Sequence, residues 1–185
     1  MLSLAAACGD SGQTTEGPVV MMETTEGTLR IELYPEEAPI TVENFLAYVD
    51  SGFYDGTVFH RIVPGFVIQG GGFTADMEQK ETRDPITNES DNGLRNLRGT
   101  LSMARLPAAH TATSQFFVNL VDNPALDHGG RPGATWGYAV FGRVIEGMDV
   151  VDAIASAPTT TAGGMADVPV EPVRIERAWR ADPSG

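Results

Sequence analysis

Arg61 is the residue in this sequence best placed to do chemistry on a ligand. It stands in an apolar, strand-forming stretch, with Phe59, Phe66 and Gln69 close by. A half-buried arginine can keep its N–H donors free for a ligand carbonyl while its guanidinium plane packs on aromatic rings. The two-residue period of a strand also allows Arg61 to face outward into solvent. The residue types therefore indicate a carbonyl-binding site, and the alternative of a solvated surface arginine stays open.

Other catalytic chemistries have less support. The three histidines, His60, His110 and His128, stand in no Gly-x-Ser-x-Gly context, and the only cysteine is Cys8, so the body of the chain shows no activated nucleophile. The sequence has no His-Glu-x-x-His, no paired cysteines and no calcium-loop spacing, so we expect neither a metal nor a cofactor. Glycines 70–72 lack the lysine of a phosphate loop and are interpreted as a tight barrel corner.

The composition indicates one β-rich domain. The 185 residues include 42% hydrophobic residues, 21 glycines and 12 prolines, which is too apolar for a disordered chain and too rich in turn residues for a helical bundle. Twelve basic residues against 25 acidic ones give a net charge of −13. Because such a field repels phosphate backbones, we expect no nucleic-acid partner.

Hydrophobic periodicity predicts about eight strands and two helices. Residues 19–25 and 28–33 form a hairpin around Glu26–Gly27, a helix begins at Thr41 as its N-cap and ends near 51–52, and a second short helix covers 150–154. The other strands are expected at 57–63, 66–69, 99–104, 114–120, 138–144 and 173–179. Residues 74–98 form a long connection of the kind that is usually functional. Closing the sheet into a barrel would remove its exposed edges.

Three stretches, in the same chain order, resemble the cyclophilins, the cyclosporin-type peptidyl-prolyl cis-trans isomerases. They are residues 59–71, residues 99–105 together with 114–119, and residues 138–144, and the similarity runs from 19 to 179. Residues 103–105, 110–113 and 136–138 are more similar to the bacterial branch. The resemblance implies a mainly β fold, a closed eight-stranded antiparallel β-barrel capped by two helices. It also implies rotation of X–Pro bonds in unfolded or extended polypeptides, which assists folding without a covalent intermediate.

The resemblance further implies a site on the outer face of the barrel. Arg61 would be the catalytic arginine, assisted by a hydrogen bond from Gln69. The proline pocket would be lined by Phe66, Val67, Phe117, Leu126 and Tyr138. Backbone groups of Ala104 and Arg105 would bind the extended peptide, and His60 and Gln115 would flank the pocket.

The sequence departs from the family upstream of Leu126, where many relatives carry Trp or Phe and this chain has Ala125. The change removes part of the apolar wall of the pocket. Compared with relatives that carry tryptophan, it also removes the indole N–H donor that contacts cyclosporin. We therefore expect weak cyclosporin binding with activity retained. Trp136, in the glycine-rich segment 127–137, either folds back toward the pocket or packs at the barrel edge.

The N-terminus predicts a lipid anchor. Ala5–Ala7 precede Cys8, and a Gly/Ser/Thr-rich stretch follows it, which resembles the end of a bacterial lipoprotein signal peptide. We interpret residues 1–18 as a signal end and flexible linker, 19–180 as the isomerase domain and 181–185 as a tail. The expected location is the cell envelope, facing the periplasm or exterior. If Cys8 is only an incidental thiol in a tail, the protein is cytoplasmic.

Two other function classes stay open on residue types alone. A peptide-binding or chaperone module would keep the pocket and gain little from Arg61. A barrel that holds a small apolar ligand would leave Arg61 unexplained. We expect a monomer, because nothing in the sequence demands more.

Overall fold

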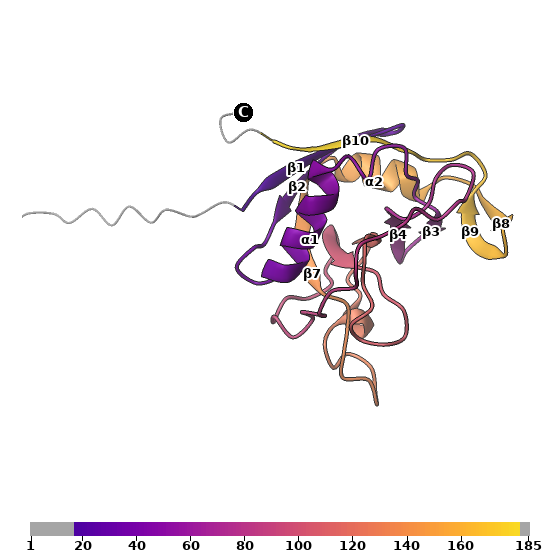
Figure 1. Cartoon of the computed structure of the whole chain (residues 1–185). Coiled ribbons are helices and arrows are strands. Elements are labelled where there is room, and N and C mark those ends of the chain that lie inside the picture. Colours follow the sequence, from indigo (N-terminus) through magenta and orange to yellow (C-terminus); the bar gives the residue numbers. More distant parts are fainter. Residues whose placement is uncertain (1–16, 182–185) are drawn as a thin grey trace, which may run out of the picture.

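The computed structural model describes residues 17–181. Its elements in chain order are β1 (Val19–Thr24), β2 (Gly27–Leu33), α1 (Pro39–Asp50), β3 (Arg61–Val63), β4 (Val67–Gly70), β5 (Thr100–Met103), β6 (Phe116–Asn119), a short 3-10 turn (Pro124–Leu126), β7 (Val140–Glu146), α2 (Met148–Ala155), β8 (Thr159–Ala162), β9 (Met165–Pro169) and β10 (Ile175–Arg180). Figure 1 shows the loops between β4 and β7, coloured pink to orange, gathered below the sheet. Neither helix in this part of the chain is long and apolar enough to cross a membrane.

Eight strands form one antiparallel sheet in the order β10-β1-β2-β7-β5-β6-β4-β3. The sheet curls until its edge strands β10 and β3 approach each other. The chain just before β3 then pairs with the chain around the start of β10, through Phe59 N–H to Val173 O (2.9 Å) and Ile175 N–H to Thr57 O (2.8 Å). The predicted eight-stranded antiparallel fold with two helices is confirmed. The predicted closed barrel is not formed. Only a short backbone pairing joins the two edges, and the sheet is a curled half-barrel without continuous strand pairing around its circumference.

The alternation of side chains along the strands separates an inner face from an outer one. Ile62, Ile68, Leu101 and Val118 point inward and join the main hydrophobic core. Their neighbours along the same strands, including Arg61, Gln69 and Phe117, therefore point outward. A register shift of one residue would bury the arginine and expose the core side chains, so core packing fixes which residues reach the outer face.

Helix α1 begins earlier than the sequence indicated. Its N-cap is Ala38, Pro39 occupies the first turn, and the prediction of Thr41 as the N-cap is wrong. The free N–H groups of Ile40 and Thr41 donate instead to the carboxylate of Glu89 at 3.1 and 2.8 Å, and the Thr41 hydroxyl donates to it at 2.6 Å. A carboxylate from a distant loop thus satisfies the helix N-terminus that a local side chain would normally cap. It also fastens the long 74–98 connection to the helix.

Other boundaries differ by a few residues from those predicted. The first hairpin turns at Thr25–Glu26, since Thr24 pairs with Gly27. Strand β3 covers only 61–63, and α2 starts at Met148. The β8–β9 hairpin, at the right of Figure 1, was not predicted, because three exposed threonines hide its alternation. Its turn residues Gly163 and Gly164 both have positive φ, so the Gly-Gly pair was a usable hairpin signal.

Candidate active site

Arg61, Gln69 and Phe117 lie side by side on the outer face of the sheet. Strand register pairs Arg61 with Gln69 across β3 and β4, and Gln69 with Phe117 across β4 and β6. The Arg61 Nη1 donates to Gln69 Oε1 at 3.4 Å, and the Gln69 amide donates to Gln115 Oε1 at 3.0 Å. The predicted Arg61–Gln69 hydrogen bond is therefore present. The hydrogen bond to Gln115 orients the side-chain amide of Gln69 so that its oxygen faces the guanidinium of Arg61.

Gly72 makes room for this row of polar side chains. A Cβ on Gly72 would lie 2.5 Å from the Gln115 Cγ, closer than side-chain atoms tolerate. Gly71 adopts a positive φ of 81° directly after β4. The interpretation of glycines 70–72 as a tight corner agrees with this backbone, and Gly72 has the added role of leaving space for Gln115.

A small apolar cluster lies beside the polar row and is separate from the main core. Val67, Phe117 and Leu126 are buried in it, and three partly buried residues pack against them: Phe66, Ala104 and Tyr138. The rings of Phe117 and Tyr138 meet edge to face with centroids 5.5 Å apart. These side chains come from β4, β6 and three loops, so only the folded chain brings them together. The five pocket residues inferred from sequence all belong to this cluster.

Arg105 holds one wall of the cluster in place. Its guanidinium donates to the carbonyls of Trp136 (2.8 Å) and Gly137 (3.0 Å) and lies over the Tyr138 ring, 4.7 Å from its centroid. The backbone N–H of Ala104 donates to Gln115 O, so that group is already used. Within residues 17–181, the Ala104 carbonyl and the peptide groups of Arg105 have no backbone partner, which leaves them available to an extended peptide.

This arrangement, an arginine beside an apolar pocket on the outside of a curled antiparallel sheet, has clear counterparts among known proteins. The family model described as "Cyclophilin type peptidyl-prolyl cis-trans isomerase/CLD" matches residues 19–179. The chain belongs to the cyclophilin family. Its reaction is the cis-trans isomerisation of peptide bonds that precede proline.

The relatives place this cyclophilin with bacterial proteins. It is 50% identical to peptidyl-prolyl cis-trans isomerase A of Dickeya dadantii over 178 residues, covering 96% of this chain and 92% of that protein. It is 58% identical to a peptidyl-prolyl cis-trans isomerase of Streptomyces antibioticus over 159 residues, covering 86% of this chain and 96% of the relative. A Cryptosporidium parvum cyclophilin, crystallised in the presence of the dipeptide Ala-Pro, superposes with a TM-score of 0.72 at 27% identity, covering 89% of this chain and 99% of that one.

His60 directly precedes Arg61 and is buried. It is 3% exposed, its ring lies 4.6 Å from that of Phe73, and it lines a cavity of about 180 Å³ against the β8–β9 hairpin. Its Nδ1 has no hydrogen-bond partner in the described part of the chain. Burial lowers the pKa of His60 to about 4, with the positive charge of Arg61 acting in the same direction. The imidazole is therefore neutral at physiological pH.

Ala125 and Trp136 border a small hollow next to Tyr138. The hollow has a volume of about 40 Å³ and is also lined by Arg105 and Arg131. The indole of Trp136 packs edge-on against His110 and His128, with centroids 5.0 and 5.4 Å apart. Trp136 thus packs between two histidines and lines the hollow next to Tyr138.

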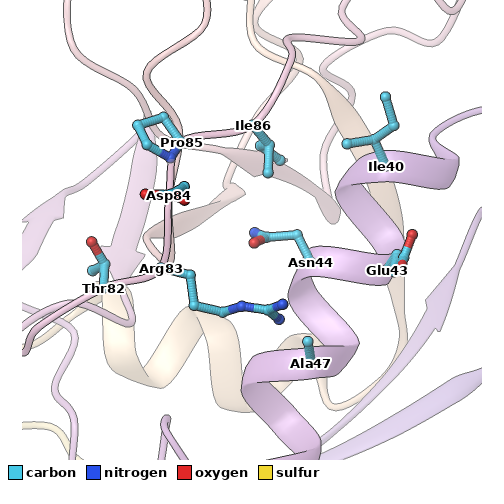
Figure 2. Close-up of a pocket in the computed structure, with 9 residues that line it drawn as sticks. All are labelled: Ile40, Glu43, Asn44, Ala47, Thr82, Arg83, Asp84, Pro85 and Ile86. Atoms are coloured by element: carbon cyan, nitrogen blue, oxygen red, sulfur yellow. The ribbon is translucent and has the colours of Figure 1, made fainter.

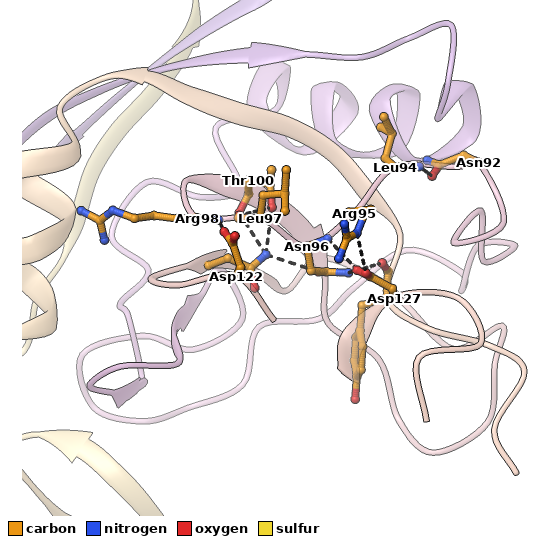
Figure 3. Close-up of polar contacts among 11 residues, drawn as sticks. Asn92, Leu94, Arg95, Asn96, Leu97, Arg98, Thr100, Asp122 and Asp127 are labelled. Carbon is orange, nitrogen blue, oxygen red and sulfur yellow. Dashed lines mark hydrogen bonds and ion pairs between the residues drawn. The ribbon is translucent and has the colours of Figure 1, made fainter. Parts of the chain in front are cut away.

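Sequence reasoning missed a buried polar network beneath the pocket. Asn96, Asn119 and Asn123 are at most 8% exposed and are linked to one another and to Asp127 by hydrogen bonds. Figure 3 shows Asn96 next to the Asp127 carboxylate, which also pairs with Arg95. The only sequence signal was a set of asparagines in otherwise apolar surroundings.

A larger cavity, of about 520 Å³, lies away from this chemistry. It is an open groove between α1 and residues 82–86, lined by Ile40, Glu43 and Asn44 among others. Figure 2 shows the Arg83 guanidinium reaching across it toward the helix. None of the residues that line it belongs to the apolar cluster or to the polar row.

Proposed function

We propose that Arg61 is the catalytic residue of this isomerase and that the Val67–Phe117–Leu126 cluster holds the proline ring of an extended polypeptide. The observation that carries the proposal is the row of Arg61, Gln69 and Phe117 on one outer face, directly beside that cluster. The Arg61 guanidinium has no ion-pair partner in the described residues and lies next to an apolar pocket. This combination suits a substrate in which a peptide carbonyl is followed by a proline ring.

The chemistry required of Arg61 is electrostatic. Rotation about an X–Pro bond must break amide resonance, against a barrier of about 18–20 kcal/mol. In the twisted state the prolyl nitrogen regains its lone pair, and a guanidinium donor placed near it binds that state more strongly than the planar amide. Gln69 keeps the guanidinium in position by accepting one of its hydrogen bonds.

The pocket must share the work with the arginine. A hydrogen bond to a charged group contributes about 1.5–3 kcal/mol, which is less than the acceleration requires. Holding the proline ring among Phe66, Val67, Phe117, Leu126 and Tyr138 removes water from the amide and restricts its motion. Gln115 and the free backbone groups of Ala104 and Arg105 would fix the peptide on either side. In this scheme His60 supports the strand that carries Arg61 and does not contact the proline.

The test is Arg61→Ala, measured by exchange spectroscopy on a short X–Pro peptide. We expect most of the turnover to disappear while peptide binding largely persists, because the pocket remains intact. Retention of wild-type turnover would remove Arg61 from the mechanism. Loss of turnover and binding together would show that Arg61 acts in binding. Arg143→Ala, which removes an exposed arginine paired with Glu32, is the control and should behave as wild type.

We also propose that Cys8 is lipidated and anchors the protein to an envelope membrane, where it would act as a monomer on unfolded or extended clients. Cys8 lies outside the described residues, and the support is its sequence context of Ala5–Ala7 and a following polar linker. Mass spectrometry of the protein from a membrane fraction of its natural host would detect the lipid on Cys8. Fractionation of Cys8→Ser with soluble proteins is the second expected result, and an unmodified thiol would refute the anchor.

A further inference from the structure

The proline pocket is assembled from segments far apart in the chain. Phe66 comes from the β3–β4 turn, Leu126 from the 3-10 turn after β6, and Tyr138 from the loop before β7. The main-chain N–H of Tyr138 donates to Leu126 O at 2.9 Å, which joins two of these walls directly. The wall at Phe66 has no such main-chain bond to either of the others in the described residues.

Phe66 O accepts the main-chain N–H of Leu120 at 2.9 Å, and Asn123 extends this connection to the Leu126 wall. Its side-chain amide donates to Phe66 O at 3.1 Å and to Asn119 Oδ1 at 2.8 Å. Its own main-chain carbonyl accepts the N–H of Leu126 at 2.9 Å. One residue, 8% exposed, thus holds the Phe66 wall with its side chain and the Leu126 wall with its backbone.

Asn96 extends the connection to the third wall. Its side-chain amide reaches Tyr138 O at 3.4 Å and Asp127 Oδ1 at 3.1 Å, and its main-chain N–H donates to the same carboxylate oxygen at 2.7 Å. The main-chain N–H of Asn123 donates to Asn96 O at 2.7 Å, which joins the two asparagines. Figure 3 shows Asn96 bonded to Asp127.

We propose that Asn123, supported by Asn96, is a positioning residue that sets the distance between the Phe66 and Leu126 walls before the substrate arrives. The proposal rests on the assignment of this cluster as the proline pocket. Buried amides have fixed partners because leaving them unpaired is costly, so a satisfied network selects one arrangement of the loops it joins. Both asparagines bond to the main chain of the walls and act through it.

This role predicts a particular kinetic signature. If the walls adopt the productive spacing only about a tenth of the time once Asn123 is removed, the apparent affinity for the peptide falls about tenfold. The bound complex still contains Arg61 and all the pocket side chains, so its turnover is preserved. We therefore expect Asn123→Ala to raise KM about tenfold and to leave kcat within about twofold of wild type.

The matched control is Asn44→Ala. Asn44 is 7% exposed and also donates its amide to one distant main-chain carbonyl, that of Thr113 at 2.7 Å. It projects from α1, as Figure 2 shows, and bonds to none of the three walls. Its removal costs one hydrogen bond of a buried amide, against two for Asn123, so Asn44→Ala shows whether a loss of stability of this kind changes KM. We expect Asn44→Ala to keep the wild-type KM.

The experiment is exchange spectroscopy of full-length wild type, Asn123→Ala and Asn44→Ala on one X–Pro peptide, well below the melting temperature of each. A raised KM in Asn123→Ala alone supports the proposal. An unchanged KM, or equal changes in both variants, overturns it. If Asn123→Ala does not fold, Asn123→Ser repeats the test with a smaller change, and failure of both to fold would assign Asn123 to fold stability and overturn the proposal. Arg61→Ala keeps the two hypotheses apart, since it is expected to lower turnover with binding retained, whereas Asn123→Ala is expected to raise KM with turnover retained.

Discussion

Gln69 receives a hydrogen bond from the Arg61 guanidinium at 3.4 Å while donating its own amide to Gln115 at 3.0 Å. The two bonds run in one direction, so the amide oxygen of Gln69 is held toward the arginine. The length of the first bond indicates a weak contact, one that limits the rotamers of Arg61 without neutralising its charge.

Replacing Gln69 by leucine should lower kcat about fivefold with little change in KM, because loss of a contact of about 1 kcal/mol leaves Arg61 present but less confined. Gln115→Leu serves as the comparison. It removes only the partner that orients the Gln69 amide, and its effect on kcat should be smaller. Steady-state kinetics on one peptide substrate will rank the two variants, and a larger effect at Gln115 would contradict this order.

Stability should fall in mild acid because of His60. Its pKa is about 4 in the folded protein, against about 6.5 when unfolded, so below pH 6.5 the unfolded chain takes up a proton that the folded chain refuses. The stabilisation is fully present above pH 6.5 and is lost as the pH falls toward 4. Between pH 7.5 and 5 it amounts to about 2 kcal/mol.

Urea titrations at these two pH values measure that loss. His60→Gln should remove most of the difference, because glutamine does not titrate. His110→Gln changes a histidine on the surface beside Trp136 and should keep the wild-type difference. An equal loss of unfolding free energy between pH 7.5 and 5 in wild type and His60→Gln would show that burial does not hold the imidazole neutral.

Isomerisation itself should not depend on pH between about 6 and 8, the range around the unperturbed histidine pKa. No proton moves in the proposed scheme, and His60, the histidine next to Arg61, has its pKa lowered to about 4. Exchange rates on one peptide at half-unit intervals will give the profile. A bell-shaped curve centred in this range would require a titrating catalytic group and contradict the electrostatic mechanism.

Cyclosporin should inhibit this cyclophilin weakly, because the small side chain of Ala125 leaves the hollow beside Tyr138 without an aromatic wall at this position. Ala125→Trp should tighten inhibition at least about tenfold by adding apolar contact and an indole donor. Ala153→Trp, an exposed position on α2, is the control and should leave inhibition unchanged. Nanomolar inhibition of the wild type would contradict the prediction, since the enzyme would then bind the drug without the aromatic wall.

Patterns in the sequence predicted the β-rich fold class, and the resemblance to the cyclophilins implied the residues of the pocket. Alternation in residues 28–33 predicted β2 and its inward side chains, because a half-buried strand needs a period of two. The resemblance to the cyclophilins implied the contact between Arg61 and Gln69, and the structure pairs the two residues across the short β3–β4 hairpin. These features depend on residues that are close together in the sequence, so local sequence patterns predict them.

Tertiary structure alone decided the features that join distant segments. Glu89 caps α1 from a loop about fifty residues away, so its role at the helix N-terminus is set by tertiary packing, while Pro39 was the local signal for the helix start. Asn123 links Phe66 to Leu126, and its partners are set by how the loops pack. His60 follows Phe59 in the family motif, but only the folded chain buries it against Phe73, and this burial lowers its pKa. Burial, long-range hydrogen bonds and loop packing are properties of the folded chain, and sequence spacing does not encode them in a readable form.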